Sequence, residues 1–185
     1  MSGRPASGRA QALIANLQLA PHPEGGWYRE IFRGAGQVRP VGARGPARHT
    51  LTSIDFLLLA GQCSAWHRVA ADEAWHLLEG GPLRLWLVPP DLRRVFHVDL
   101  APADAEGRRP RHVVPAMWWQ AAEQVAEAVS PGGQATAGDA DEHGFSYVGA
   151  TVGPGFDFAD FSFGRDDPAL HQALQALRPD TLRLL

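Results

Sequence analysis

The segment GQCSAWHRVAADEAWHLLEG, from Gly61 to Gly80, decides the fold of this chain. A glycine stands at each end, and His67 and Glu73 divide the interval into steps of five, five and six intervening residues. The stretches around His67 and around Glu73 are rich in strand-favouring side chains, and a Gly-Gly-Pro turn sequence closes the segment. We therefore expect two short β-strands that carry one histidine and one acidic residue.

Short strand-like segments continue on both sides of this stretch. We expect strands at residues 27–32, 51–59, 66–69, 73–78, 83–88, 94–100, 112–114, 118–122, 145–152 and 156–163. They recur roughly every 8–12 residues between turns that use many of the 20 Gly and 15 Pro, and a short helix is expected at each end of the chain. The pattern predicts an all-β sandwich or small barrel.

The composition excludes several kinds of chemistry. All 17 basic residues are Arg, so neither a Schiff-base lysine nor a P-loop lysine is present. The single cysteine, Cys63, rules out an internal disulfide and a CxxC metal knuckle. A net charge of -3 gives no reason to expect nucleic acid or an acidic membrane as a partner. With no apolar run near ~18 residues and no signal-like N-terminus, a cytoplasmic protein is expected.

The spacing in the deciding segment resembles the first motif of the cupin superfamily, G-x5-H-x-H-x3-E-x6-G. Gly61, His67, Glu73 and Gly80 match that motif, but Val69 stands where it has its second histidine. The second cupin motif, P-x-G-x2-H, would begin at Pro115. In that alignment its glycine is replaced by Met117 and its histidine by Gln120.

Two further segments make the resemblance more specific. HPEGGWYRE at residues 22–30 and GFDFADF at residues 155–161 are similar to motifs of a small cupin family of unknown function. The resemblance covers about residues 10–163. It implies one cupin domain over residues 1–185, a jelly-roll barrel (double-stranded β-helix) with short terminal helices, a core at about 22–163 and flexible residues 1–9. It also implies a pocket inside the barrel and a homodimer. Asp55 departs from a tyrosine expected in that family.

Strand alternation indicates which side chains enter the barrel. Residues two apart share a face, so His67, Glu73, Trp75, Trp118 and Gln120 form an expected inward set. Apolar walls with a few polar groups are typical of small-molecule sites. We therefore expect the barrel to bind a small polar, sugar-like metabolite.

Three hypotheses remain open for the chemistry of this pocket. In the first, the barrel is a metal-free isomerase or epimerase. Sugar epimerases of the superfamily use a histidine base and a tyrosine acid, which would be His67 with Tyr28 or Tyr147 here. Glu73 would orient His67. Arg29 or Arg68 would hold a carboxylate or phosphate of the substrate.

In the second hypothesis, the protein is a metal-dependent cupin enzyme, an oxygenase or an isomerase. No cofactor is predicted outright, and a divalent metal is the alternative that this hypothesis adds. The ligands would be His67, Glu73 and Gln120, and a bulge that turned His76 inward would restore a 2-His-1-carboxylate set.

In the third hypothesis, the protein is a binding module without chemistry, in which Trp75, Trp118 and Phe158 stack on a ligand. The sequence gives Glu24 a turn role next to Gly25-Gly26, and it gives His22 no role.

Overall fold

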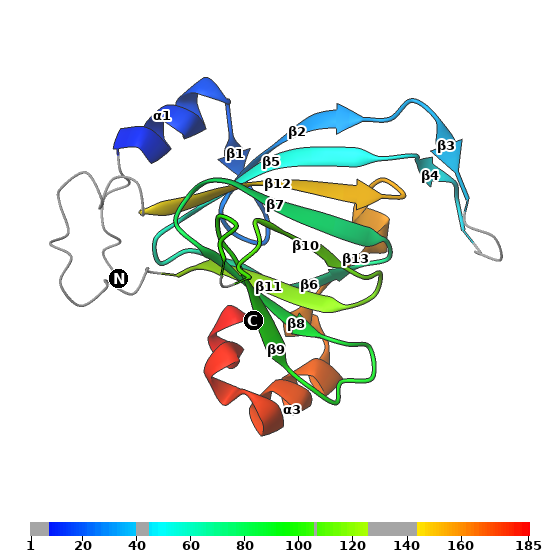
Figure 1. Ribbon diagram of the computed structural model, residues 1–185. Coiled ribbons are helices and arrows are strands. Elements are labelled where there is room, and N and C mark those ends of the chain that lie inside the picture. The colour runs from blue at the N-terminus through cyan, green and yellow to red at the C-terminus, as the bar shows by residue number, and fades with distance from the viewer. Residues whose placement is uncertain (1–7, 40–44, 106, 126–143) are drawn as a thin grey trace, which may run out of the picture.

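Two β-sheets face each other and form the body of the protein (Figure 1). The structure is a computed structural model, and it describes residues 8–39, 45–105, 107–125 and 144–185. The first sheet has the order β1 (Ala20–Pro21), β2 (Trp27–Arg33), β5 (Thr52–Leu59), β12 (Phe145–Gly153), β7 (Asp72–Gly80) and β10 (Arg111–Val114). The second has the order β13 (Phe161–Phe163), β6 (Cys63–Val69), β11 (Trp119–Gln124), β8 (Leu83–Val88) and β9 (Phe96–Leu100).

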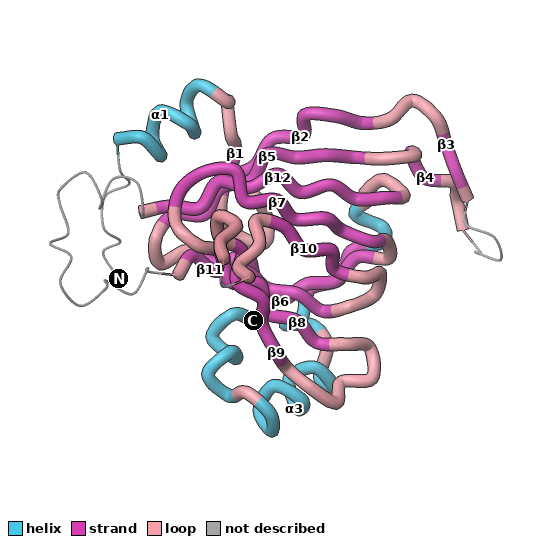
Figure 2. The backbone as a smooth tube through the Cα atoms, viewed as in Figure 1, coloured by secondary structure: helices cyan, strands magenta, loops and turns pink. Residues whose placement is uncertain are grey.

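The remaining elements lie around these two sheets, as the tube in Figure 2 shows. A small pair of strands, β3 (Gln37–Val38) and β4 (Arg48–His49), extends beyond the ends of β2 and β5. The helical elements are α1 (Gly8–Asn16), η1 (Phe158–Asp160), η2 (Gly164–Asp166), α3 (Pro168–Leu177) and η3 (Pro179–Leu184). The predicted all-β barrel with a short helix near each end is confirmed.

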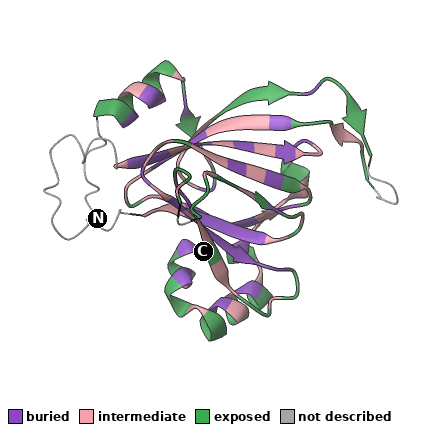
Figure 3. Ribbon diagram, in the orientation of Figure 1, coloured by how far each residue is buried: buried purple, intermediate pink, exposed green. Residues whose placement is uncertain are grey.

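Alternating burial along the strands explains how the sheets enclose a core. On β12, Val148, Ala150 and Val152 are buried, and the residues between them are only half-buried. Inward side chains of this kind from both sheets form the main hydrophobic cluster. Figure 3 shows buried stretches along strands of both sheets. Burial of each large apolar side chain contributes about 1.5–3 kcal/mol, so this layer holds the two sheets together.

The outer faces of the sheets are partly covered by the helices. Leu170 and Leu174 of α3 pack with Trp66, Trp86 and Trp119 on the five-stranded sheet. The α3 helix begins where Asp167 accepts a hydrogen bond from the Leu170 amide, with proline at the first helical position. On the other side, α1 packs against Leu57 and Phe145 of the six-stranded sheet.

Two sequence-based boundaries differ from the structure. Residues 8 and 9 were expected in a flexible N-terminus, but both belong to α1; residues 1–7 lie outside the described part of the chain. The strand expected at residues 156–163 is interrupted by η1, because the Asp157 carboxylate accepts a hydrogen bond from the Ala159 amide and turns the chain. Only Phe161–Phe163 remains as a strand. In the described residues, no helix has the length and apolar character needed to cross a membrane.

Candidate functional site

A cavity of about 300 Å³ opens into the barrel between the two sheets. Its polar lining consists of His22, Glu24, Glu30, Arg33, Thr52, His67, Glu73 and Asp157. Its apolar and aromatic lining consists of Tyr28, Ile54, Val69, Ala150, Val152, Phe156, Phe158 and Phe161. Most of these side chains come from β2, β5, β6, β7 and β12, so strand alternation aims them into the barrel.

Gln120 joins the two sheets behind the wall of this cavity. Its side-chain oxygen accepts a hydrogen bond of 3.1 Å from the indole Nε1 of Trp75. Since an indole N–H can only donate, this contact fixes which way the amide group points. The amide nitrogen of Gln120 therefore faces His67 Nε2 at 3.0 Å and Glu73 Oε2 at 2.5 Å. All four side chains are buried.

These contacts also determine where His67 carries its proton. Its Nδ1 lies 2.7 Å from the carbonyl oxygen of Ala65, which can only accept, so Nδ1 is protonated. Its Nε2 faces the Gln120 amide nitrogen, which can only donate, so Nε2 accepts. Burial lowers the pKa of His67, which favours this neutral ring. The ring is also stacked against Phe161, with 5.4 Å between the centroids.

Glu24 reaches the same histidine from the turn between β1 and β2. The Gly25 amide donates to the His22 carbonyl at 3.0 Å, and the Ala65 amide donates to the Glu24 carbonyl at 2.8 Å. Gly25 has a φ of 109°, and a Cβ there would overlap the Cys63 carbonyl oxygen, so glycine lets the turn approach β6. The turn thereby places Glu24 Oε2 3.1 Å from His67 Nδ1.

Both buried acids of the cavity hold protons more strongly than an exposed glutamate. Burial raises the pKa of Glu24 to about 8, although a hydrogen bond of 2.9 Å from the Ser64 hydroxyl opposes the shift. Burial raises the pKa of Glu73 to about 7; the nearby Glu24 adds to the rise, and His67 and Gln120 oppose it. Near neutral pH these groups can therefore exchange protons, which is the property required of a general acid or base.

Part of the predicted site comes together in this cavity. His67, Glu73, Tyr28 and Phe158 line it. Gln120 and Trp75 lie behind its wall, where they hold His67 and Glu73 in place. Trp75 therefore orients the Gln120 amide group and is not one of the residues that line the cavity.

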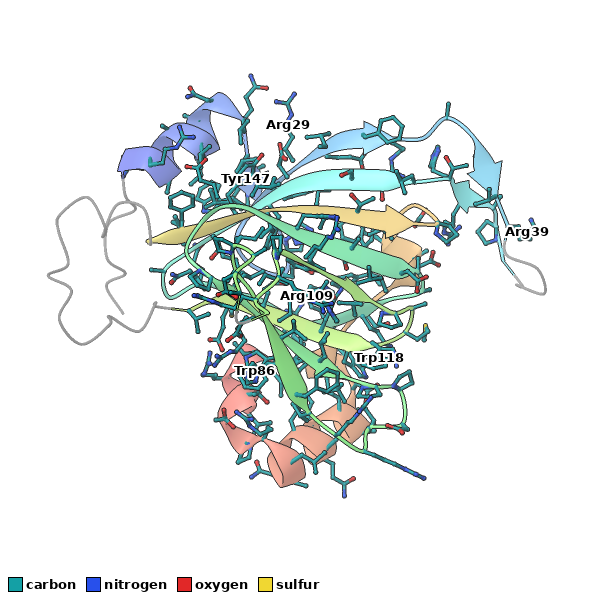
Figure 4. The ribbon with its side chains drawn as sticks, in the orientation of Figure 1. Arg29, Arg39, Trp86, Arg109, Trp118 and Tyr147 are labelled. Atoms are coloured by element: carbon teal, nitrogen blue, oxygen red, sulfur yellow. The ribbon has the colours of Figure 1, made fainter. Side chains whose placement is uncertain are left out.

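Tyr147 and the two predicted anion-binding arginines lie elsewhere. The Tyr147 hydroxyl donates to Asp55 Oδ1 at 2.8 Å outside the cavity; burial is the largest cause of its raised pKa, about 12. Arg29 donates to the Leu17 carbonyl at 3.1 Å, and Figure 4 shows it with Tyr147 toward the α1 side of the first sheet. Arg68 lies 4.3 Å from the ring centroid of Trp119 on the outside of the second sheet.

The alternation of side chains along each strand explains why Arg29 and Arg68 lie outside the cavity. Tyr28 and His67 face the cavity, so their neighbours Arg29 and Arg68 face outward. The predicted site contained both residues of each neighbouring pair, but adjacent residues of a strand point to opposite faces.

Trp118 differs from its predicted inward position, and His76 does not take the inward position that the metal hypothesis required. Trp118 precedes β11, next to a residue with a φ of 67°, and packs edge-on against Phe96 with 6.0 Å between the centroids. It therefore belongs to the core and does not line the cavity. His76 lies opposite Arg111 of β10 and Gly149 of β12 in the regular part of β7, and the register shift of β7 comes after it, so no bulge turns it inward. The 2-His-1-carboxylate set is therefore not assembled.

The predicted metal ligands do not fit a metal ion in this arrangement. His67 Nε2 and Glu73 Oε2 both point at the amide hydrogens of Gln120, where a cation would need lone pairs. The second histidine position of the motif is apolar Val69. Over the part of the chain that the structure describes, no three His, Cys, Asp or Glu side chains are grouped as metal ligands.

The site also contains residues for which the sequence predicts no such role. His22, Glu24, Glu30, Arg33 and Asp157 line the cavity. The signal for the first two was the HPEGG segment itself, in which an acidic residue precedes two glycines. It indicates a turn equally well, and only the close approach of that turn to β6 shows that Glu24 enters the barrel.

The two antiparallel sheets face each other and enclose a cavity. His67 and Glu73 of the Gly61–Gly80 segment line this cavity, which is the arrangement of a cupin barrel. The chain belongs to the Cupin_5 family, described as "Cupin superfamily (DUF985)", which matches residues 11–164. No curated protein matches the chain.

Two solved structures are similar along nearly their whole length. A hypothetical protein from Leishmania major is 30% identical, with a TM-score of 0.68, over 88% of this chain and 97% of that one. A protein from Shewanella oneidensis, solved by X-ray crystallography, is 31% identical, with a TM-score of 0.69, over 95% of this chain and 96% of that one. These similarities support the family assignment and leave the activity to be argued from the cavity.

Proposed function

We propose that this cupin binds a small uncharged hydroxycarbonyl compound, such as a keto sugar, and that Glu73 moves a proton on a carbon next to its carbonyl group. The observation that carries the proposal is the free oxygen of Glu73. Within the described residues, the hydrogen bonds of this carboxyl group involve only Oε2. The fully enclosed side-chain atoms without a partner are Trp27 Nε1 and His171 Nε2. Because Oε1 of Glu73 is neither hydrogen-bonded nor among these enclosed atoms, it is open to the cavity that Glu73 lines.

Glu73 suits the role of base better than His67 does. Each nitrogen of His67 already has a partner, Ala65 for Nδ1 and Gln120 for Nε2, so neither is left for a ligand. Glu73, with a pKa of about 7, is partly ionised at neutral pH and can take and return a proton. His67 then acts as a neutral member of the wall that holds Gln120.

The charges of the cavity favour a ligand without negative charge. Four acidic side chains line it, and the lining arginine, Arg33, is already paired. Arg33 Nε and Nη2 donate to the two carboxylate oxygens of Glu30 at 2.9 and 2.6 Å, and Nη1 donates to the Phe156 carbonyl at 3.2 Å. A phosphate or carboxylate would therefore meet acidic groups without a free cation from this arginine.

The aromatic wall supports a ligand with apolar faces. Phe156 and Phe158 meet edge-on with 5.0 Å between the centroids, and Phe161 closes the cluster against His67. Phe158 is 55% exposed, so its ring is accessible for stacking. Sugar rings present C–H faces that pack on aromatic rings while their hydroxyl groups bond to polar side chains.

The test is deuterium exchange in D2O, followed by proton NMR, with dihydroxyacetone and fructose as probes. We expect wild-type protein to exchange hydrogen at the carbon next to the carbonyl, and Glu73→Gln to lose at least about a hundredfold of that rate. The matched control is Glu79→Gln, since Glu79 lies on the same strand but pairs with Arg9 outside the cavity. A probe that binds and stabilises wild-type protein but never exchanges would favour the non-catalytic binding module instead.

A further inference from the structure

His22 is a buried imidazole on the cavity wall that the proton transfer by Glu73 leaves unused. Its side chain is only 8% exposed. Its ring lies edge-on against Tyr28, with 4.4 Å between the centroids, and against Phe56, with 5.9 Å. These contacts hold the ring in one orientation beside the cavity.

The proton of His22 can be assigned from one contact. The backbone N–H of Glu24 donates to His22 Nδ1 at 3.3 Å. Nδ1 must therefore present its lone pair, and in a neutral ring the proton is on Nε2. Burial, with the nearby His67 as a second cause, lowers the pKa of His22 to about 4, so the ring stays neutral at physiological pH.

The Nε2–H group has no acceptor in the part of the chain that the structure describes. Among the described residues, every hydrogen bond or ion-pair contact of His22's ring uses Nδ1. Nε2 is also absent from the enclosed unpaired atoms, which are those of Trp27 and His171. A donor that lines a cavity, is fixed in orientation and lacks an acceptor is suited to bind an oxygen atom of a ligand.

We infer that His22 is a second ligand-binding and catalytic residue, whose Nε2–H donates to the carbonyl oxygen of the compound that Glu73 acts on. The inference rests on the proposed function and deepens it, because it names the side chain that binds the carbonyl oxygen of the substrate. Glu73 Oε1 removes the proton from the adjacent carbon, and the C–H electron pair forms a C=C bond. The carbonyl π electrons move to oxygen, which His22 stabilises by its hydrogen bond, and Glu73 returns the proton. A neutral imidazole donor stabilises such an enolate without becoming a competing base.

The first experiment uses wild-type protein labelled with 15N at histidine. We expect the His22 signals to report a protonated Nε2 and an unprotonated Nδ1, and the Nε2 signal to shift on titration with dihydroxyacetone. The control probe is 1,3-propanediol, which keeps both hydroxyl groups but lacks the carbonyl, and it should leave that signal nearly in place. A protonated Nδ1, or no shift with dihydroxyacetone, overturns the inference.

The second experiment uses two variants with opposite expectations. His22→Phe keeps an aromatic ring but removes the donor, and should weaken dihydroxyacetone binding about tenfold and slow exchange further. His22→Gln restores a side-chain N–H donor and should recover part of both. Circular dichroism and a thermal melt show whether each variant is folded, and the wild-type titration decides the matter if neither is.

The outcomes separate the two claims. Exchange that is lost in Glu73→Gln but unchanged in His22→Phe refutes the role of His22 and leaves the proposed function standing. A carbonyl-specific shift of the His22 signal without exchange in wild-type protein supports the binding role of His22 and refutes the proton transfer by Glu73.

Discussion

Trp75 and Gln120 lie on opposite sheets of the barrel, and the indole Nε1 of Trp75 donates to the side-chain oxygen of Gln120 at 3.1 Å. This single bond determines that the amide hydrogens, rather than the amide oxygen, face His67 and Glu73. The acceptor role of His67 Nε2 and the misfit of a metal ion both follow from it. A tryptophan behind the wall thus decides what the cavity can do.

The substitution Trp75→Phe removes this donor and keeps an aromatic ring. The Gln120 amide is then free to turn its oxygen toward Glu73, which takes away a hydrogen bond that lowers the pKa of that acid. We expect the exchange rate of wild-type protein to rise with pH through a midpoint near 7, and the midpoint of Trp75→Phe to lie higher. Stability should fall by about 1–3 kcal/mol. The pH profile of deuterium exchange and urea unfolding provide the measurements.

Trp66→Phe is the matched control for this loss of an indole donor. Trp66 Nε1 donates to the Thr181 carbonyl at 3.1 Å on the far side of the second sheet. Trp66→Phe should lower the free energy of unfolding about as much as Trp75→Phe does, without moving the pH midpoint of exchange. Equal midpoints in Trp75→Phe and wild-type protein would show that Gln120 is not held by Trp75.

A metal site can be built by changing two side chains. Val69 lines the cavity two residues after His67 on the same strand face, and Gln120 faces both His67 and Glu73. In the double variant Val69→His, Gln120→His, three imidazoles and one carboxylate meet without an amide between them. We expect it to bind Co²⁺ at least about a hundredfold more tightly than wild-type protein, as measured by the visible absorption of the bound ion.

The single variant Val69→His is the informative control, because it adds a ligand but leaves the Gln120 amide in place. It should gain little affinity for Co²⁺. Tight binding of Co²⁺ by wild-type protein would contradict the argument that the amide hydrogens occupy the position of the ion.

The two buried acids couple the stability of the fold to pH. The pKa of Glu24 rises from 4.5 to about 8 and that of Glu73 from 4.5 to about 7, mainly because both are buried. Between these values the folded protein holds more protons than the unfolded chain, so the free energy of unfolding falls as pH rises. His22 and His67 act in the opposite sense below pH 6.5, where the unfolded chain takes up their protons first.

Between pH 6.5 and about pH 8 the effect of the acids dominates, because the raised pKa values of Cys63 and Tyr147 act mainly at higher pH. We expect the free energy of unfolding to decline over this interval, by up to about 1.4 kcal/mol per pH unit for each acid. Urea unfolding at pH 6.5 and at about pH 9 checks this, and Glu24→Gln should flatten the decline. A stability that rises over this interval would mean that the acids are ionised in the folded protein.

The sequence predicts the barrel well because its evidence is local and repeated. Alternating strand segments, glycine-rich turns and the spacing from Gly61 to Gly80 all depend on neighbours along the chain. Alternation also explains why Tyr28 and His67 line the cavity, whereas their neighbours Arg29 and Arg68 face outward.

The remainder of the site depends on contacts between distant segments. The approach of the Glu24 turn to β6 joins residues 40 positions apart, and the bond from Trp75 to Gln120 spans 45. No periodicity along the chain encodes such a pairing. The cytoplasmic location and the homodimer stay predictions, since they concern surroundings and partners rather than the folded chain.

The close approach of the Glu24 turn depends on Gly25. Its φ of 109° already disfavours other residues, and an added Cβ would overlap the Cys63 carbonyl oxygen. We expect Gly25→Ala to push the turn off β6, withdraw Glu24 from His67, and lower the free energy of unfolding by about 2–4 kcal/mol.

Gly61→Ala is the control, because Gly61 has a φ of 81° but open space around its Cβ position. It should cost only about 1 kcal/mol in urea unfolding and leave the pH dependence of stability intact, whereas Gly25→Ala should lose the part due to Glu24. Equal costs for the two variants would mean that backbone strain alone, and not the contact with β6, explains the glycine.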